Sequence, residues 1–339
     1  MRPSFLLEII IPTFKRPETA VKSALSALNQ ISTEELERDV HVVVCDDCTP
    51  GLREQFFRDS FQCHNDNVTI IHNRLNKGMS QNIYDLVCQS SSTFCTILTD
   101  DDWINPNVVA DIIKEIRACM MNESSSQNPS DIVGIISVPR YSYLESGQLH
   151  CIECCPYPSD KLVSPNNLNV LRLCRNAFIL TGLIFRPSLI DFSLWDHNIQ
   201  NAFFPLLYYA SIASKANVLF LKREWFHHTC DNVCHWESWG NTEIKRFMRL
   251  HADYLKALAL IRYSYPPVNN LAEKSRYFLE YKRAIVQQLY LFPGSKTAQF
   301  VAIWRLFLYS PRILTSYFFF VGKLLFLKIR FLCRSVYLL

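Results

Sequence analysis

Short runs of β-branched and aliphatic residues alternate with helix-like patterns along the first half of the chain. Residues 6–11 form a nearly continuous apolar run that ends at Pro12, and similar runs follow at residues 40–45, 68–72 and 93–98. A strand that is apolar on both faces is typical of a parallel sheet covered by helices. The alternation therefore predicts an α/β fold with a largely parallel sheet.

Helix signals lie between these runs. Pro17 opens a predicted helix after the first strand, and Asn105 with Pro106 predict the cap and first residue of a helix after the fourth. Residues 122–130 are polar and serine-rich, which predicts a surface loop. Two further strands are predicted at residues 131–138 and 178–185.

The composition indicates a globular chain of modest charge. The 339 residues are enough for one large domain and a smaller unit, and 49% hydrophobic residues exclude a disordered chain. A net charge of +4 does not by itself indicate nucleic acid as a partner, and none is expected. The alternating pattern changes to helical patterns near residue 225. We therefore expect an α/β domain at residues 1–225 and a helical region at 226–299.

The 13 cysteines are irregularly spaced, and the N-terminus carries no signal-peptide pattern. We therefore expect reduced thiols and a cytoplasmic protein. A structural zinc site is an alternative that the spacing does not favour, because it fits no familiar zinc pattern. The cysteines concerned are Cys45 with Cys48, Cys151 with Cys154 and Cys155, and Cys230 with Cys234 and His235.

Residues 300–339 form a basic, aromatic tail that contains six lysines and arginines and no acid. Its most apolar stretch, residues 313–327, is short for a spanning helix and is interrupted by Lys323. An amphipathic helix in the membrane interface fits better. We expect this tail to hold the protein peripherally on the inner face of the membrane. The alternative is a terminal helix packed on the protein.

Two aspartate clusters directly follow predicted strands. Asp46 and Asp47 follow the second strand, and residues 100–102 are three consecutive aspartates after the fourth. In open α/β sheets this carboxyl edge binds ligands. Crowded carboxylates need a cation, and hard oxygen ligands suit Mg²⁺ or Mn²⁺ on a nucleotide diphosphate. The alternative is structural, since Asp102 could cap a helix that begins near Pro106.

Four segments in order resemble motifs of the family 2 glycosyltransferases, whose fold is the GT-A type. They are IIIPTFKR (9–16), VVVCDDCT (42–49), NKG (76–78) with Asn82, and ILTDDDW (97–103) with Pro106. The similarity is good over residues 6–110 and loose to about 225. It implies a GT-A-like, mixed α/β sheet with flanking helices.

The resemblance also implies a donor site and a metal site. The nucleotide-sugar would contact Pro12, Thr13, Arg16, Asp46, Asp47, Asn76, Lys77, Gly78 and Asp100. Mn²⁺ or Mg²⁺ would be bound by Asp101 and Asp102, with Asp101 as the main ligand and Asp102 as the less settled of the two.

The chain departs from the family in three places. Cys48 stands where the family usually has glycine, and Thr99 where many members have the first acid of the metal motif. The Glu-Asp pair that supplies a base in inverting members has no clear match, because that region reads NAFFP (201–205). An inverting transfer needs a group that accepts the proton of the attacking hydroxyl. We select Asp196, the nearest acid, and the alternative is that Asp196 is a surface residue.

The sequence thus predicts a metal-assisted, inverting glycosyltransferase. It would move a sugar from a nucleotide-diphosphate donor to a hydroxyl of a glycan or lipid-linked glycan. One alternative is a non-catalytic, membrane-associated binding protein on the same fold. Another is a sugar nucleotidyltransferase, although residues 12–17 lack the usual glycine-rich loop. His227, His228 and the WESW segment (236–239) indicate either acceptor binding or an aromatic domain interface.

Overall fold

The computed structural model describes residues 5–53, 55–64, 66–125, 131–144, 146–153, 157–165, 180–196 and 198–229, with helical positions 253, 256, 257, 260 and 261. The chain divides into two compact units, and the first comprises Met1–Cys234 and Tyr254–Tyr265. The strands and helices below belong to this first unit. The tail at 300–339 lies outside the described residues, and so does the WESW segment.

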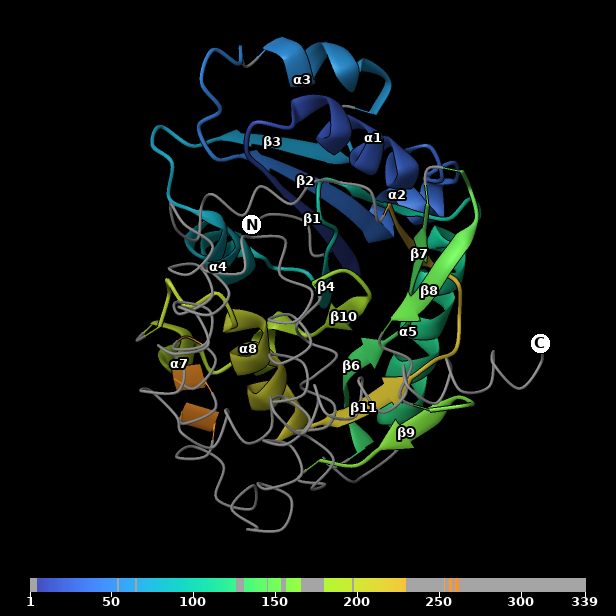
Figure 1. Cartoon of the computed structure of the whole chain (residues 1–339). Coiled ribbons are helices and arrows are strands. Elements are labelled where there is room, and N and C mark those ends of the chain that lie inside the picture. The colour runs from blue at the N-terminus through green and yellow to red at the C-terminus, as the bar shows by residue number, and fades with distance from the viewer. Residues whose placement is uncertain are drawn as a thin grey trace, which may run out of the picture. The chain divides into compact units, whose positions relative to one another are not determined.

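Within the described ranges, eight strands form one mixed sheet (Figure 1). The pairs β1–β2, β2–β3 and β1–β4 are parallel, and β10 runs antiparallel to β4 and β6. The order across the sheet is β3 (Val68–His72), β2 (Val40–Asp46), β1 (Leu7–Thr13), β4 (Phe94–Ile97), β10 (Leu183–Phe185), β6 (Val133–Ser137), β11 (Asn217–Phe220) and β9 (Lys161–Val163).

A second, four-stranded sheet was not predicted. Its order is β5 (Asp102–Ile104), β12 (Phe226–Thr229), β7 (Arg140–Tyr143) and β8 (Leu149–Glu153). The expected helical region from residue 226 is therefore wrong for its first four residues, which pair with β5 and β7. The short strands β5 and β12 owe their structure to this pairing, which brings residues 102–104 beside residues 226–228.

Helices flank the main sheet, as predicted. They are α1 (Pro17–Leu28), α2 (Glu34–Asp39), α3 (Gln55–Ser60), α4 (Met79–Gln89), α5 (Val109–Ser125), α7 (Phe192–Asp196) and α8 (Phe204–Ala213), with short 3-10 turns at η1 (Gln62–His64) and η4 (Pro187–Leu189). None of the helices in the described ranges combines the length and the apolar character that crossing a membrane requires.

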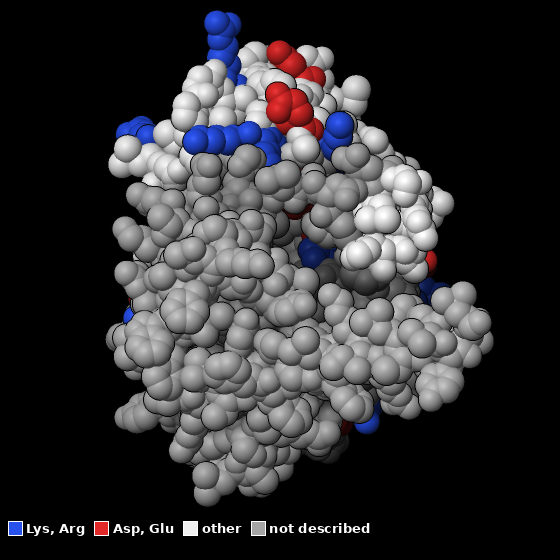
Figure 2. Space-filling model, viewed as in Figure 1, with Lys and Arg blue, Asp and Glu red and all other residues white. Residues whose placement is uncertain are grey.

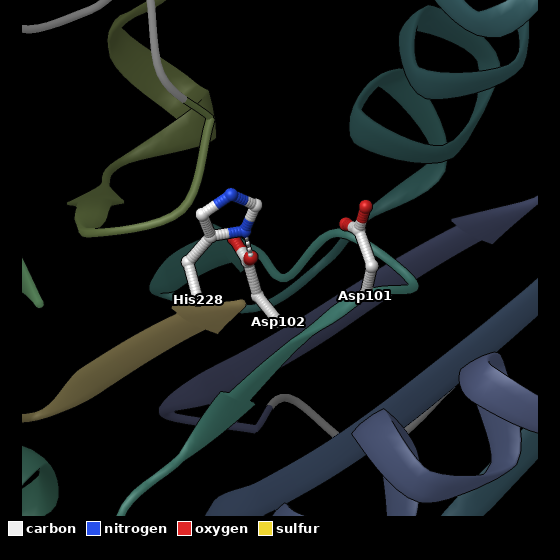
Figure 3. A group of neighbouring side chains, drawn as sticks. All are labelled: Asp101, Asp102 and His228. Carbon is white, nitrogen blue, oxygen red and sulfur yellow. Dashed lines mark hydrogen bonds and ion pairs between the residues drawn. The ribbon is translucent and has the colours of Figure 1, made fainter. Parts of the chain in front are cut away.

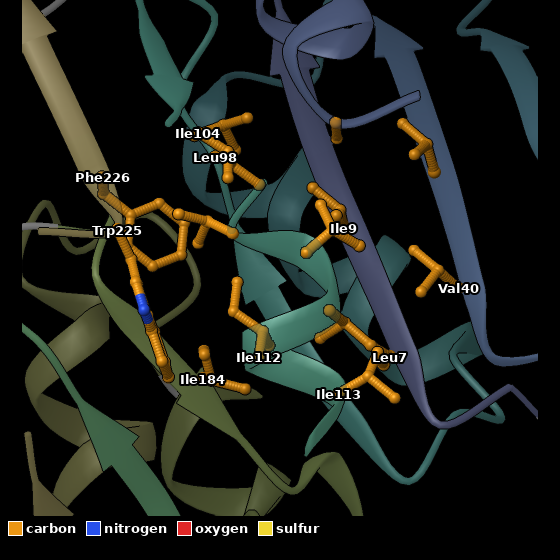
Figure 4. Packing of buried hydrophobic residues seen from close by; sticks show 14 of the residues in the cluster. Leu7, Ile9, Val40, Leu98, Ile104, Ile112, Ile113, Ile184, Trp225 and Phe226 are labelled. Atoms are coloured by element: carbon orange, nitrogen blue, oxygen red, sulfur yellow. The ribbon is translucent and has the colours of Figure 1, made fainter. Parts of the chain in front are cut away.

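The central strand β1 is buried on both faces, which explains its continuous apolar run. Leu7 and Ile9 lie in one core cluster with Val40 of β2 and Ile112 of α5 (Figure 4), and Ile10 is equally buried on the other face. Each such side chain contributes about 2 kcal/mol when it leaves water. The mixed α/β sheet predicted from the sequence is thereby confirmed.

The sequence predicted that the first strand ends at Pro12, but β1 continues to Thr13. The Ile10 carbonyl accepts the Leu98 N–H on the β4 side, and the Thr13 carbonyl accepts the Asp47 N–H on the β2 side. Backbone groups alternate in direction, so the N–H that Pro12 lacks would face β4. The pairing of β1 with β4 has already ended at Ile10. Proline therefore removes no ladder hydrogen bond here.

The helix predicted from Pro106 begins instead at Val109. Asn107 has a φ of 65°, a left-handed conformation that a helix cannot include. The side chain of Gln30, on the turn after α1, caps α5: its Oε1 accepts the N–H groups of Val108 at 2.7 Å and Val109 at 3.0 Å. At the other end α5 runs to Ser125, so residues 122–125 are helical and not part of the predicted loop.

The described part of the face shown in Figure 2 carries its charged side chains unevenly. Lysines, arginines and acids gather over the region of α1–α3, while the surface over β7 and β8 carries few of them. Leu149 and Ile152, on β8, are exposed apolar side chains. This part of the second sheet therefore exposes at least these two apolar side chains.

We predict that Gln30→Ala lowers the free energy of unfolding by about 2 kcal/mol, because two helix N–H groups lose their acceptor. Urea denaturation measures the loss. The matched control is Gln55→Ala, whose amide contacts only the exposed Asp59 among its recorded partners. Equal stability of the two variants would contradict the capping role.

Candidate active site

The carboxyl ends of the parallel strands bring the predicted donor-site residues to one edge of the sheet. β1 ends at Thr13 and β2 at Asp46, and the turn after β4 contains Asp100 and Asp101, with Asp102 at the start of β5. This arrangement follows from the parallel pairing of β1 with both neighbours. It places the side chains that follow these strands where α/β proteins bind ligands.

Arg16, Thr13 and two of the aspartates form a connected group. Thr13 Oγ1 donates to Asp100 Oδ2 at 2.8 Å. Arg16 Nη2 lies 2.5 Å from Asp100 Oδ1, and its Nη1 lies 2.8 Å from Asp101 Oδ2. Burial raises the pKa of Asp100 to about 7, although the positive charge of Arg16 acts in the opposite direction. One guanidinium thus bridges two adjacent carboxylates.

Asp102 belongs to strand β5, so the alternative that it caps a helix beginning near Pro106 is wrong. It is 1% exposed and pairs with His228 across β5 and β12. Its Oδ1 lies 2.6 Å from His228 Nδ1, and its Oδ2 lies 3.5 Å from Arg140 Nη1. Burial acts to raise the pKa of Asp102, but the hydrogen bond from His228 and the charge of Arg140 lower it overall.

Asp101, Asp102 and His228 form the candidate metal site in the part of the chain that the structure describes. Each offers one ligand atom, and these atoms lie within 4.8 Å of one another. Figure 3 shows the His228 ring with one nitrogen toward Asp102 and the other on the opposite side of the ring. Carboxylate oxygens and an imidazole nitrogen suit Mn²⁺ and are compatible with Mg²⁺.

The sequence did not indicate His228 as a candidate metal ligand, since its pattern indicated either acceptor binding or an aromatic domain interface. It lies 126 positions from Asp102 in the chain. Only the antiparallel β5–β12 pair brings the two together. The adjacent His227 faces the other way, where its ring contacts Trp103 and Tyr143. The two histidines therefore occupy opposite faces of the second sheet.

Asp47 holds the loop that precedes α4. Its Oδ1 accepts the backbone N–H of Lys77 at 2.9 Å and the side-chain amide of Asn73 at 2.9 Å, and its Oδ2 accepts the N–H of Gly78 at 2.8 Å. Asn76 Oδ1 also accepts the Gly78 N–H. Gly78 has a φ of 81°, which favours glycine at this position. The Asp47 carboxylate is thus engaged by the protein itself.

Asp46 and Lys77 also have partners within the protein. Asp46 Oδ2 accepts the N–H of Thr49 at 3.0 Å and lies 3.5 Å from His72 Nδ1. The Lys77 ammonium lies 2.6 Å from Asp85. Cys48, where the family usually has glycine, adopts a φ of 66°. The turn after Asp47 therefore contains a residue in the left-handed conformation, which glycine would adopt more readily than cysteine.

The first cysteine pair offers no zinc site. Cys45 is buried and its Sγ donates to Asn82 Oδ1, while Cys48 Sγ contacts the Arg74 carbonyl. Burial raises the pKa of Cys45 to about 12, which disfavours the thiolate that a metal needs. The side chains of the other cysteine groups lie outside the described residues.

Asp196 is the exposed last residue of α7 and is not joined to the aspartate turn by any recorded contact of the described residues. The hydroxyl of Tyr84, on α4, donates a hydrogen bond to it. This bond raises the pKa of Tyr84. Asp196 therefore has a defined position beside α4.

The fold is of the GT-A type, as the sequence resemblance implied. Residues 8–120 match the model of glycosyl transferase family 2. This match agrees with the resemblance to the family 2 glycosyltransferases that the four motifs indicated.

One solved structure shares the fold, and a second shows a weaker similarity. Residues 1–349 of TarS from S. aureus in complex with UDP-GlcNAc superpose with a TM-score of 0.51 at 14% identity, covering 83% of this chain and 80% of that one. The mannosyltransferase PcManGT from Pyrobaculum calidifontis, in complex with GDP-Man and Mn²⁺, gives a TM-score of 0.46 at 14% identity, with 93% and 86% covered. No curated protein sequence matches the chain.

We predict that Asp47→Asn lowers the free energy of unfolding by about 2–3 kcal/mol, because the new amide group replaces an oxygen that accepts backbone N–H groups. Chemical denaturation measures this loss, and hydrogen exchange at Lys77 and Gly78 should accelerate. Asp59→Asn, on the exposed face of α3, is the control. Unchanged exchange at both amides would refute the loop-holding role.

Proposed function

We propose that this chain transfers a sugar from a nucleotide-diphosphate donor to a hydroxyl of a glycan or lipid-linked glycan. The observation that carries the proposal is the convergence of Asp101 and His228 at the sheet edge that also holds Thr13, Arg16 and Asp100. Carboxylates and an imidazole beside a cationic group suit a metal-bound diphosphate. The family match over residues 8–120 supports the same reaction class.

Mn²⁺ or Mg²⁺ would be bound by Asp101 and His228 Nε2. His228 fits this role because its Nδ1 is hydrogen-bonded to Asp102, which fixes the ring and leaves the second nitrogen for a metal. Asp102 was predicted as a ligand, but both of its oxygens already face cationic or donor groups. We propose that Asp102 orients His228. The ion would neutralise charge on the departing diphosphate.

The nucleotide would lie along the ends of β1, β2 and β4. Pro12, Thr13 and Asp100 would form one side, with Asp100 toward the ribose. Asp46 and Asp47 would lie toward the base. Asp47 would act largely through the backbone it holds, since it already accepts three hydrogen bonds. The other side of the nucleotide site would be formed by the segment whose backbone Asp47 hydrogen-bonds, which comprises Asn76, Lys77 and Gly78.

An inverting transfer would use Asp196 as the base. The segment after α7 runs beside the proposed donor wall, because a Cβ built on Gly78 would lie 3.9 Å from Gln200 Oε1. The Tyr84 hydroxyl, on the helix that begins after Gly78, fixes the Asp196 carboxylate. An exposed carboxylate that is fixed beside this wall is suited to accept a proton from an incoming hydroxyl.

The acceptor and the membrane remain linked in this proposal. A basic, aromatic tail at residues 300–339 would bind the inner membrane face, where a lipid-linked acceptor is available. A nucleotidyltransferase is not favoured, because residues 12–17 between β1 and α1 contain no glycine. A non-catalytic protein is not favoured either, since it has no need for three adjacent aspartates.

Calorimetric titration with UDP, GDP, CDP and TDP, each with and without Mn²⁺, tests the donor and metal sites. We expect one diphosphate to bind more tightly with Mn²⁺, and Asp101→Ala and His228→Ala to abolish this metal dependence. Asp102→Asn should weaken metal binding about 10–100-fold. Asp111→Ala, an exposed acid in the first turn of α5, is the control. No binding of any diphosphate would favour the non-catalytic alternative.

The base role is tested with the donor so identified. Asp196→Asn should lower kcat about 10²–10⁴-fold without changing nucleotide affinity. Asp191→Asn is the matched control, because Asp191 only caps α7 through the N–H and hydroxyl of Ser193. The anomeric configuration of the product, read by NMR, should be inverted. A retained configuration would eliminate Asp196 as the base.

A further inference from the structure

One guanidinium occupies a carboxylate that the proposed metal would need. Arg16 contacts Asp100 Oδ1 at 2.5 Å and Asp101 Oδ2 at 2.8 Å. The second contact involves the residue proposed as the main metal ligand. The Arg16 side chain is 34% exposed, whereas that of Asp100 is 3% exposed. The Arg16 guanidinium is therefore accessible to solvent, whereas the Asp100 carboxylate is buried and fixed in place.

A divalent ion at Asp101 would compete with this guanidinium. Mn²⁺ or Mg²⁺ binds a carboxylate oxygen at roughly 2.0–2.2 Å, which is shorter than the Arg16–Asp101 contact. An ion on the same oxygen would stand within a few ångströms of a positive charge, and like charges so close repel strongly. Metal binding and the Arg16–Asp101 ion pair therefore oppose each other.

The backbone of Arg16 is anchored independently of its side chain. Its carbonyl accepts hydrogen bonds from the Thr13 and Thr19 hydroxyls and from the Ala20 N–H. Pro17 fixes the first turn of α1 directly after it. Thr13 also holds Asp100 through its own hydrogen bond. The guanidinium can therefore leave Asp101 without any change in the course of the loop.

We propose that Arg16 is an internal counter-cation that keeps a divalent ion off Asp101 until a nucleoside diphosphate arrives. This inference rests on the proposed metal site. The diphosphate supplies new oxygens that an arginine binds well, so Arg16 moves to the phosphate and the ion takes its place. Metal and nucleotide then strengthen each other's binding by the same factor, as linkage requires.

Mn²⁺ titrations followed by the EPR signal of the free ion test the proposal on the full chain. The proteins are wild type, Arg16→Met, Arg16→Gln and Arg16→Lys, with Arg38→Met of α2 as the surface control. Without nucleotide, Arg16→Met and Arg16→Gln should bind Mn²⁺ about 10-fold more tightly than wild type. Arg16→Lys and Arg38→Met should match wild type, because each keeps a positive charge at position 16.

The same titrations in the presence of UDP and of GDP measure the coupling. One nucleotide should tighten Mn²⁺ binding about 10-fold in wild type. In Arg16→Met the competing positive charge is already absent, so the nucleotide should tighten Mn²⁺ binding much less. Thermal melts identify a variant that does not fold. Because Arg16→Met and Arg16→Gln both remove the charge, either one can be used if the other does not fold.

The outcomes separate this inference from the proposed function. If Arg16→Met and wild type bind Mn²⁺ equally well and Asp101→Ala, titrated beside them, does not bind it, the counter-cation role is overturned and the metal site is retained. No Mn²⁺ binding to any protein, with or without nucleotide, would overturn the metal site and the counter-cation together. A drop in stability of Arg16→Met with unchanged Mn²⁺ affinity would reduce Arg16 to a structural role and overturn the inference.

Discussion

Three consecutive aspartates, residues 100–102, follow one another from the turn after β4 into β5, two of them are buried, and their mutual repulsion must be offset wherever this segment forms. Arg16 offsets two of them, while Arg140 and His228 offset the third. These three partners come from the loop after β1, from β7 and from β12. The charge arrangement therefore exists only when distant parts of the first unit have come together. Asp102 therefore has two compensating partners, whereas Asp100 and Asp101 share one guanidinium.

The backbone around this turn depends on a stripe of polar side chains along α1. Ser23 Oγ donates to the Thr99 carbonyl at 3.1 Å, Ser26 Oγ accepts the Ile104 N–H, and Gln30 caps α5. These three residues are spaced by three and four positions, so they share one side of α1 and of the turn that follows it. They supply hydrogen bonds to a segment that has few of its own, since β5 is only three residues long. A helix predicted for its apolar face thus also positions the site through its polar side chains.

Most of the main sheet could be predicted from the sequence because its signals are local. A run such as residues 6–11 is long and apolar enough to indicate a buried strand, and the aspartates after such strands indicate the functional edge. The missed features depend on distant pairing. β5 and β12 have three and four residues, too few to show a period, and each forms because the other is present. The start of α5 is likewise set by Gln30, more than seventy positions earlier, which no local pattern around Pro106 reveals.

Environment gives the three aspartates different chemistry although their side chains are identical. Asp102 has both oxygens engaged and a lowered pKa, which suits it to holding His228. Asp100 is buried with Thr13 and has a raised pKa, while Asp101 is the more accessible and contacts a cation that can move. The residue before them fits this division. Thr99, where many family members have an acid, lies 3.3 Å from the Thr181 hydroxyl. A fourth carboxylate there would face a neutral partner and add repulsion to the turn, so the neutral Thr99 lets Arg16 compensate two carboxylates in place of three.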